Sequence, residues 1–426
     1  MAAQLEIPAR DVKRAHGMFR ALSHRNFRLF WVGAFLSNVG TWMQAVAQGW
    51  LVLQLTDSPF WLGVDGFMAT VPGLGLTLVG GVFADLVDRR RILIYTQVGA
   101  LLSALSLAVL IVTGVVNDAS DVWIILMLSF ATGCCMSLAG PSYQAITIDL
   151  VGREDLANAI ALNSSQFQLS RVIGPVFAGL AFKFFGLAEC FFLNAASFVA
   201  VIIALMMVRY DEAKGARPAH SAKDRRALWQ DLIDGFRYVW KRPRVFMLLL
   251  ISAVTSLFGA PYMSMMPVFA RDVHHLGETG LAAMMGIAGA GAFFGALALA
   301  YLGNFRRKGW SVLGGSLSFG VCIIGFALST NLVMSGIFIF GMGVAIVCSV
   351  AVTNTLLQQL VRDEMRGRVL SMFMLSFIGT MPIGNLVAGA TSERFGAPRT
   401  LATGGFIIAV FITIVTLRYR SLRDLH

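Results

Sequence analysis

The chain has 426 residues, of which 57% are hydrophobic and only 13% are charged. Water-soluble domains carry roughly 25% charged residues. The composition therefore excludes a soluble fold, because such a fold could not bury this much apolar surface. A net charge of +11 alone could indicate a nucleic-acid binder, but the basic residues follow a membrane topology instead.

Apolar stretches recur along the whole chain, and about 20 apolar residues suffice to cross a bilayer. Short polar turns separate twelve of them, and one long polar segment divides them into six plus six. The expected spans are 29–54, 59–86, 92–116, 122–148, 159–186, 188–208, 245–269, 279–303, 309–329, 332–358, 368–391 and 398–417. We therefore predict an all-α membrane protein with twelve transmembrane helices in two six-helix halves.

The polar segments set the domain boundaries. We predict an N-terminal tail over 1–28, a first half over 29–208, a linker over 209–244, a second half over 245–417 and a tail over 418–426. Residues 1–26 contain no short apolar core with a cleavage site, so we do not expect a signal peptide. Within the linker, 211–226 predicts a flexible charged chain, and 227–243 predicts an amphipathic helix bearing two tryptophans.

Lysine and arginine are distributed very unevenly between the two sets of turns. With the N-terminus in the cytoplasm, 29 of them lie on the cytoplasmic side and four on the other side. This bias predicts that both termini are cytoplasmic. It also explains the net charge without nucleic acid, because these residues would face anionic lipid.

Two pairs of similar turns indicate an internal repeat. Arg89-Arg90-Arg91 after the second span and Arg306-Arg307-Lys308 after the eighth are 217 positions apart, close to half the chain. Leu150-Val151 and Leu360-Val361 follow the fourth and tenth spans, 210 positions apart. Duplicated halves are typical of transporters; the alternative is coincidence among short basic turns.

The stretch GGVFADLVDRRR, residues 80–91, lies at the cytoplasmic end of the second span. It lacks the lysine and the preceding strand that a phosphate-binding loop requires. Its arginines follow the C-terminal end of a helix, where cations are favourable. Asp85 is an anion at that same end, close to hydrocarbon, so it needs a nearby arginine or the N-terminus of another helix as a partner.

Gly81, Asp85, Arg89 and Arg90 in this spacing resemble the signature loop of the major facilitator superfamily, and twelve spans with a central loop resemble it over nearly the whole chain. The resemblance implies that Asp85 docks against the N-terminus of helix 11, expected near residues 366–368, and latches the halves in an outward-open state. Leu86 and Asp88 depart from the common pattern, so the latch would depend more on Arg89 and Arg90, with Asp149 as their partner.

The fifth span contains a proline between glycines, with Gly174, Pro175 and Gly179 following Arg171. It resembles the glycine-proline motif of the superfamily's exporters; the alternative is a packing kink. Further stretches resemble the enterobactin-exporter branch, which holds siderophore exporters and drug-efflux proteins. They are residues 40–50, 140–144, 150–151, 161–163 and 366–369, together with the amphipathic helix.

Polar side chains in apolar spans identify candidate substrate contacts. Ser37, Thr41, Gln44 and Gln48 share one face of the first span, and Asn163 and Gln166 lie in the fifth. Because polar groups avoid lipid, we expect them to line a central cavity; the alternative is hydrogen bonding between helices.

Arg171 is the only basic residue deep inside a span. Such a charge indicates a functional site, here for an anionic or catechol-like substrate, or a structural ion pair. Tyr262 and Met266 of the seventh span suit an adaptable apolar pocket, and equally suit ordinary packing.

Proton coupling requires a carboxylate that changes its protonation state during transport. Asp65, near the outer end of the second span, is the candidate, and the alternative is an exposed aspartate at a helix end.

The function predicted from these features is secondary export of an amphipathic, siderophore-like or drug-like compound by alternating access, with proton antiport. The alternative is an importer or uniporter on the same fold. An intramembrane enzyme is excluded because the chain has no HExxH motif and its histidines occupy polar segments. We expect a monomer in a bacterial inner membrane, working with a small-molecule substrate, protons and anionic lipids, with no cofactor, metal or nucleic acid.

Overall fold

The computed structural model of the protein describes residues 19–208, 235–303 and 305–425, without the side chains of residues 78, 82 and 84–86. Every regular element in these residues is helical, which confirms the predicted all-α class. The first half contains η1 (Arg20–Ser23), α1 (Arg25–Thr56), α2 (Pro59–Thr70), α3 (Gly73–Leu86), α4 (Arg89–Val112), η2 (Ala119–Asp121), α5 (Val122–Phe184) and α6 (Leu187–Met207). The second half contains α9 (Pro243–Gly259), α10 (Pro261–Val268), η3 (Phe269–Val273), α11 (Glu278–Leu302), α12 (Lys308–Leu328), α13 (Leu332–Leu360), α14 (Asp363–Ile378), α15 (Met381–Phe395), α16 (Ala397–Arg418) and α17 (Arg420–Arg423).

Nine helical runs in the described part of the chain are long and apolar enough to cross a membrane, judged by length and composition. Large apolar side chains are exposed along these helices, among them Phe177, Leu297 and Phe406. Exposed apolar side chains in such numbers fit a protein surrounded by lipid rather than water. Helix α1 and the pair α2 and α3 are not among the nine, so the count of twelve stays a prediction.

Three expected spans are divided where proline interrupts the helix. Helices α2 and α3 meet at Pro72, α9 and α10 meet at Pro261, and α14 and α15 meet just before Pro382. Proline has no N–H to donate to the preceding turn, so each span bends or breaks at this point. The expected spans over 59–86, 245–269 and 368–391 therefore each comprise two helical segments.

Helix α5 consists of two helical segments joined at Gly152, whose φ of 74° and ψ of 177° are not helical. This kink lies inside the polar turn that was expected over 149–158 between the fourth and fifth spans. Glycine adopts this positive φ without a steric penalty, so a single residue redirects the helix. The expected start of helix 11 near 366–368 is also corrected, since α14 begins at Asp363.

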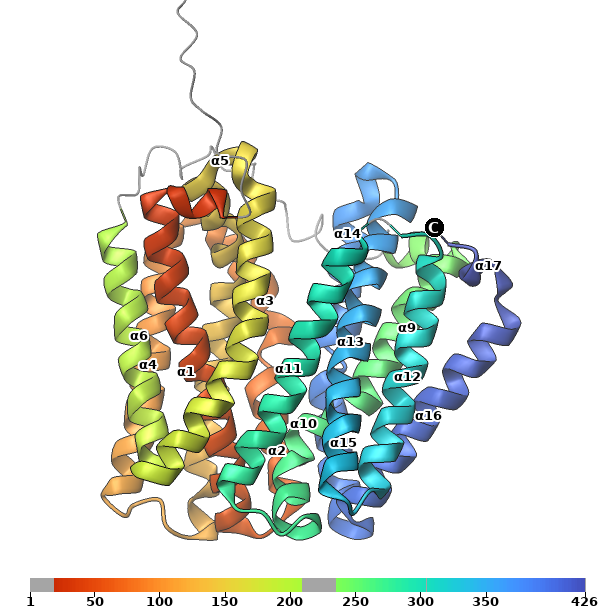
Figure 1. Cartoon of the computed structure of the whole chain (residues 1–426). Helices are drawn as coiled ribbons and strands as arrows, with labels where there is room; N and C mark the ends of the chain where they lie inside the picture. The colour runs from red at the N-terminus through yellow and green to blue at the C-terminus, as the bar shows by residue number, and fades with distance from the viewer. Residues whose placement is uncertain (1–18, 209–234, 304, 426) are drawn as a thin grey trace, which may run out of the picture.

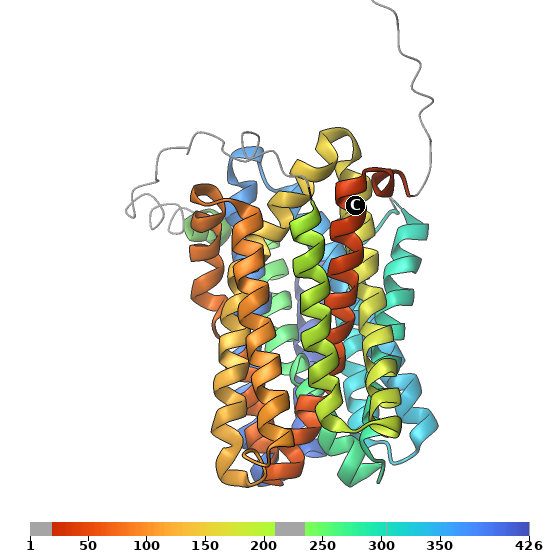
Figure 2. The same ribbon diagram turned by 90° about the vertical axis from the view of Figure 1, so that its left-hand side faces the viewer.

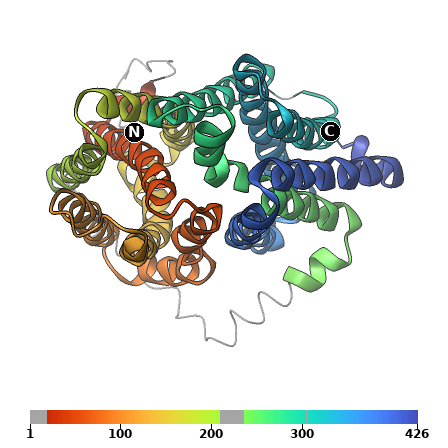
Figure 3. The ribbon, with the colours of Figure 1, turned by 90° about the horizontal axis from the view of Figure 1, so that it is seen from below.

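The helices form two groups that lie side by side (Figure 1). In the first, α1, α4, α5 and α6 lie side by side (Figure 2), and they contact one another in sequence-distant pairs. In the second, α12 contacts α13 and α16, and α11 contacts α13. The two groups meet chiefly through α5 with α11 and α2 with α15, as the view along the helices illustrates (Figure 3).

Helices η1 and α17 lie at the same end of the bundle (Figure 1), which we call the termini end. Helix α17 is held there because the Gly309 N–H donates to the Leu425 carbonyl at 3.1 Å and Leu422 is buried. The amphipathic helix expected over 227–243 falls mostly outside the described residues. Its described part, 235–240, packs on α14, where the Arg362 N–H donates to the Tyr238 hydroxyl at 3.4 Å.

Candidate functional site

A hydrogen-bonded cluster connects α1, α2 and α5 inside the first half. The Gln48 amide donates to the Asp65 carboxylate at 2.8 and 3.1 Å, and also to the Ser129 hydroxyl at 2.7 Å. The Ser129 hydroxyl in turn donates to Asp65 at 2.5 Å. We call Gln48, Asp65 and Ser129 the Asp65 cluster.

The Asp65 cluster continues along α1 to α6. The Gln44 amide lies 3.4 Å from the Gln48 carbonyl oxygen, and the Asn194 amide donates to Gln44 at 2.6 Å. Ser197 donates to Asn194 at 3.0 Å. A chain of neutral amides and hydroxyls therefore leads from Asp65 to α6.

Asp65 is partly buried and is held only by neutral donors. In the described residues it makes no ion pair, and its oxygens accept from Gln48 and Ser129. An anion among apolar helices is costly without a cationic partner, whereas the protonated carboxyl is neutral. Protonation of the Asp65 carboxylate would therefore remove this charge and weaken the hydrogen bonds that it accepts from Gln48 and Ser129.

The upper part of the predicted polar face of α1 packs against other helices. Ser37 is buried, and the Thr41 hydroxyl donates to the Ser37 carbonyl of its own helix at 2.9 Å. Gly33 lies close to α6, where a Cβ would come within 2.8 Å of the Ala204 Cβ. This face therefore meets α6 closely, and its polar groups are satisfied within the bundle.

Arg171 lies where the two halves meet. Its guanidinium carbon is 5.2 Å from the centre of the Trp42 ring, and its charged group lies beside the Tyr262 hydroxyl of α10. Neither Nε of Arg171 nor the hydroxyl of Tyr262 forms a well-aligned hydrogen bond. Among the described residues no carboxylate pairs with Arg171, so its charge is offset mainly by an aromatic face.

The glycine-proline motif packs α5 against a different helix on each side. A Cβ at Gly174 would lie 2.5 Å from the Trp42 Cβ, so the backbones of α5 and α1 approach closely there. A Cβ at Gly179 would lie 3.3 Å from the Ala282 Cβ of α11. Pro175 is buried between them. The motif thus positions α5 at the seam between the halves.

The other predicted cavity residues are buried or partly buried, and two of them have side-chain atoms without a well-aligned hydrogen bond. They are both amide atoms of Gln166, which lies beside Tyr143, and the side-chain oxygen of Asn163, whose amide donates to Thr147 at 3.2 Å. Met266 is fully buried. Buried polar groups are normally hydrogen-bonded, so these atoms are available to a ligand or to water.

The structure shows the expected pair between the loop over 80–91 and α5. Arg89 donates to Asp149 at 2.7 Å, and both side chains are mostly buried. Arg90 instead binds the last carbonyls of α6, Leu205 at 2.7 Å and Met206 at 2.8 Å. A cation there is favourable because helix C-termini carry a partial negative charge.

The Asp85 side chain lies outside the described residues, so its docking on α14 stays a prediction. Gly81 has open space beside it, with no atom within 4 Å of a built Cβ. Asp88 has a definite local task, since its carboxylate accepts from the Arg90 N–H at 2.8 Å and caps α4. Asp88, which stands where the superfamily loop often has glycine, therefore caps the start of α4.

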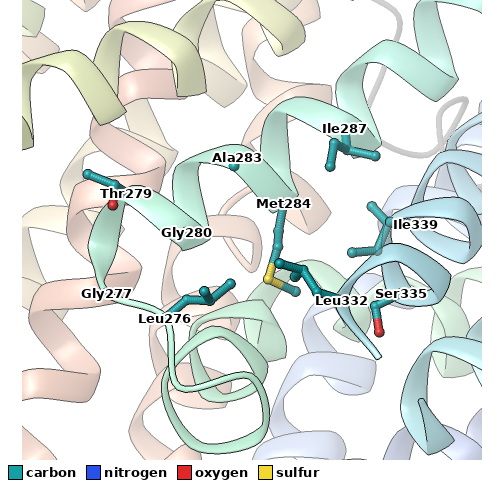
Figure 4. A pocket seen from close by; sticks show the side chains of 11 residues that line it. Leu276, Gly277, Thr279, Gly280, Ala283, Met284, Ile287, Leu332, Ser335 and Ile339 are labelled. Carbon is teal, nitrogen blue, oxygen red and sulfur yellow. The ribbon is translucent and has the colours of Figure 1, made fainter. Parts of the chain in front are cut away.

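Two pockets flank α11, one inside the second half and one between the two halves. One of about 330 Å³ lies between α11 and α13, where the Met284 and Leu332 side chains meet (Figure 4). The other, of about 520 Å³, lies between α5 and α11, with Lys183 at its edge. Their linings are mostly apolar, so they offer few groups to orient a polar ligand.

Sequence reasoning missed Ser129 and Asn194. Ser129 completes the Asp65 cluster from α5, and Asn194 links it to α6. Both are polar residues inside apolar spans, the same signal that identified the α1 face. That signal could have found them, but it could not have shown which helix faces they meet.

Residues 16–424 match the transmembrane secretion effector family. The chain is 25% identical over 396 residues to the Staphyloferrin A transporter of Staphylococcus aureus (strain NCTC 8325 / PS 47), covering 91% of this chain and 94% of that protein. It is also 25% identical to the Multidrug efflux pump Tap of Mycolicibacterium fortuitum, over 86% of this chain and 89% of that one. To the Enterobactin exporter EntS of Shigella boydii serotype 18 it is 24% identical over 94% of both.

Among solved structures, the fold resembles a bacterial homolog of the human lysosomal transporter Spinster in its inward-facing and unoccupied conformation. The TM-score is 0.72 at 15% identity, covering 94% of this chain and 98% of that one. Family and relatives are membrane transporters rather than enzymes. The chain therefore belongs to the transmembrane secretion effector family, within the major facilitator superfamily, and is a multi-pass membrane transporter of small molecules.

Proposed function

We propose that the protein exports an amphipathic organic compound, siderophore-like or drug-like, from the cytoplasm by alternating access coupled to proton re-entry. Export is supported by the family and by relatives named as an efflux pump and an enterobactin exporter. In this proposal the termini end faces the cytoplasm of a bacterial inner membrane, as the charge bias predicts. The transporter works as a monomer, with anionic lipid beside its basic turns.

The observation that carries proton coupling is the environment of Asp65. A carboxylate held by Gln48 and Ser129, with no cation paired to it in the described residues, gains or loses a proton with a full change of local charge. Protonation removes the cost of an anion among apolar helices. The two states of Asp65 therefore favour different arrangements of α1, α2 and α5, which is what coupling requires.

The substrate site is proposed at the seam near Arg171, rather than in the two pockets beside α11. Nε of Arg171 and the hydroxyl of Tyr262 form no well-aligned hydrogen bond there. These atoms can bind an anionic or phenolic group, while Met266 offers an adaptable apolar contact. Ser37, Thr41, Gln44, Gln48 and Asn163 complete the proposed lining as the halves move.

Helix motions are proposed to depend on the loop over 80–91. Asp85 would dock on the N-terminus of α14 when the termini end closes, with Gly81 allowing close approach. Arg89 and Asp149, already paired, hold the loop on α5. The Gly174, Pro175 and Gly179 motif keeps α5 close to α1 and α11 during this motion.

The test is transport of a panel of siderophores and lipophilic drugs from cells expressing the protein, with and without an uncoupler. Export predicts that expressing cells retain less of at least one compound, and that the uncoupler abolishes the difference. Greater accumulation in expressing cells, lost with the uncoupler, would identify the importer alternative. Movement that only follows the concentration gradient would identify a uniporter.

A further inference from the structure

Two oppositely charged side chains of the second half hold the turn between α1 and α2, at the end away from the termini. Glu393, near the end of α15, accepts from the Ser58 hydroxyl at 2.7 Å and from the Phe60 N–H at 3.3 Å. Arg271, in η3, donates to the Leu53 carbonyl at 3.3 Å and pairs with Asp57 at 2.6 Å.

Each charge meets the helix end that suits it. Helix α2 starts at Pro59, and its N-cap Ser58 forms no side-chain cap of its own, so the Glu393 carboxylate supplies an acceptor at this positive end. Helix α1 ends at Thr56, and the Arg271 guanidinium lies at this negative end. Both favourable contacts cross from one half of the molecule to the other.

Beside this clamp, α2 and α15 touch through their backbones. A Cβ at Gly63 would lie 2.7 Å from the Gly389 Cα, and a Cβ at Gly66 would lie 2.7 Å from the Asn385 amide. Asn385, Gly389 and Glu393 recur every four residues, so they form one stripe of α15 facing α2. The backbones of α2 and α15 thus meet directly beside the contacts of Glu393 with Ser58 and Phe60.

We propose that Glu393 and Arg271 form a clamp that keeps the halves closed at this end and must release each time the transporter opens there. The clamp joins the same two spans as the loop over 80–91, at their opposite end: α2 and α3 form one span, and α14 and α15 form the other. There, Asp85 at the end of α3 is expected to meet the start of α14; here, Glu393 at the end of α15 meets the start of α2. The two carboxylates therefore act in opposite directions on one conformational equilibrium.

The proposal rests on membership of a transporter family, and not on the proposed substrate, direction or proton coupling. It can be tested without transport by spin-label distance measurements in a cysteine-free background. Ala119 and Val333, both exposed, report on the clamped end from opposite halves. Val87 and Tyr301, also exposed and on opposite halves, report on the termini end.

In Glu393→Ala we expect the longer Ala119–Val333 distances to gain population by roughly two- to thirtyfold, the range for a carboxylate at a helix N-terminus. The Val87–Tyr301 distances should shorten in the same sample. Glu393→Gln should have a smaller effect, because the amide oxygen still accepts from Ser58 but the charge is gone. Arg271→Gln should shift both distributions in the same direction as Glu393→Ala.

Glu278→Gln is the matched control, because it removes a carboxylate of the same type at the same end, from the first turn of α11. It should leave both distance distributions unchanged. Unaltered distributions in Glu393→Ala and Arg271→Gln would overturn the clamp. An equal shift in Glu278→Gln would also overturn it, since net charge rather than the contacts with α1 and α2 would then be responsible.

Discussion

Asp65 and Arg171 are charged residues inside the bundle whose surroundings compensate them in different ways. Asp65 receives short hydrogen bonds from neutral donors, and a proton can remove its charge. Arg171 has no carboxylate partner among the described residues, and its charge is offset by the Trp42 ring. The carboxylate is thus suited to changing state during transport, and the guanidinium is suited to holding an anion.

Replacing Asp65 tests its role in coupling. In Asp65→Asn, proton-driven efflux should fall by roughly five- to 150-fold, the range of typical coupling free energies between sites. The amide keeps the size of the side chain and can still accept from Ser129, so the folded protein should persist. Counterflow of substrate without a proton gradient should be retained, and this assay separates coupling from binding.

The matched control is Asp424→Asn, which makes the same chemical change at an exposed position of the C-terminal segment. It should leave efflux unchanged. Full proton-driven efflux in Asp65→Asn would remove Asp65 from the mechanism.

Replacing Arg171 tests the proposed anion contact. In Arg171→Gln, the KM for an anionic substrate should rise by roughly ten- to 100-fold, because a hydrogen bond to a charged group contributes about 1.5–3 kcal/mol. Arg171→Lys should recover part of the affinity, since it keeps the charge but not the planar fork. The measurement is initial transport rate against concentration, with a neutral substrate of the same transporter as control; equal losses for both substrates would contradict the idea.

At the scale of elements, small residues decide which helices can meet. Pro72 and Pro261 each divide a span into two helical segments, which the pattern of apolar runs did not predict. The polar turn expected over 149–158 contains the kink at Gly152. Only the tertiary structure shows that Asp155 of this turn pairs with Arg20 and His24.

Two helical glycines allow a matched test of helix packing. Gly174→Ala should destabilise the protein by about 1–3 kcal/mol, because its Cβ would clash with the Trp42 Cβ and overpacking is costly. Gly314→Ala, in α12, meets no atom within 4 Å and should be neutral or stabilise by up to about 1 kcal/mol, the difference in helix propensity. Thermal unfolding of the detergent-solubilised protein measures both, and equal midpoints would refute the close-packing argument.

At the scale of the whole molecule, the two halves touch along α5 with α11 and α2 with α15. The described contacts across the α2–α15 seam concentrate at the end away from the termini, where the clamp lies. A transporter that alternates must break this set and form another at the termini end. We expect the contacts at both ends of the seam that α2 and α3 form with α14 and α15 to determine which state is more populated.

Asp85 is the residue with which this equilibrium can be tested at the termini end. Asp85→Asn should leave membrane insertion intact and lower transport by roughly two- to thirtyfold, since a carboxylate at a helix N-terminus contributes up to about 2 kcal/mol. Surface expression checks the prediction for insertion, and the transport rate in the same cells checks the prediction for transport. Combining it with Glu393→Ala should restore part of the rate, because the two changes oppose each other; unchanged transport in the single variant would exclude the latch.

Composition, apolar runs and basic turns by themselves determined that this is an all-α membrane protein in two halves, because lipid requires long helices whose backbone groups are satisfied within each segment. They also identified polar positions such as Gln48, Asp65 and Arg171, since polar groups are rare in apolar spans. Only the tertiary structure decided that Ser129 completes the Asp65 cluster, that Trp42 and Tyr262 meet Arg171, and that Glu393 caps α2. Such partners lie on different helices, and their meeting depends on the rotation and approach of each helix, which are set by packing across the bundle rather than by the local sequence.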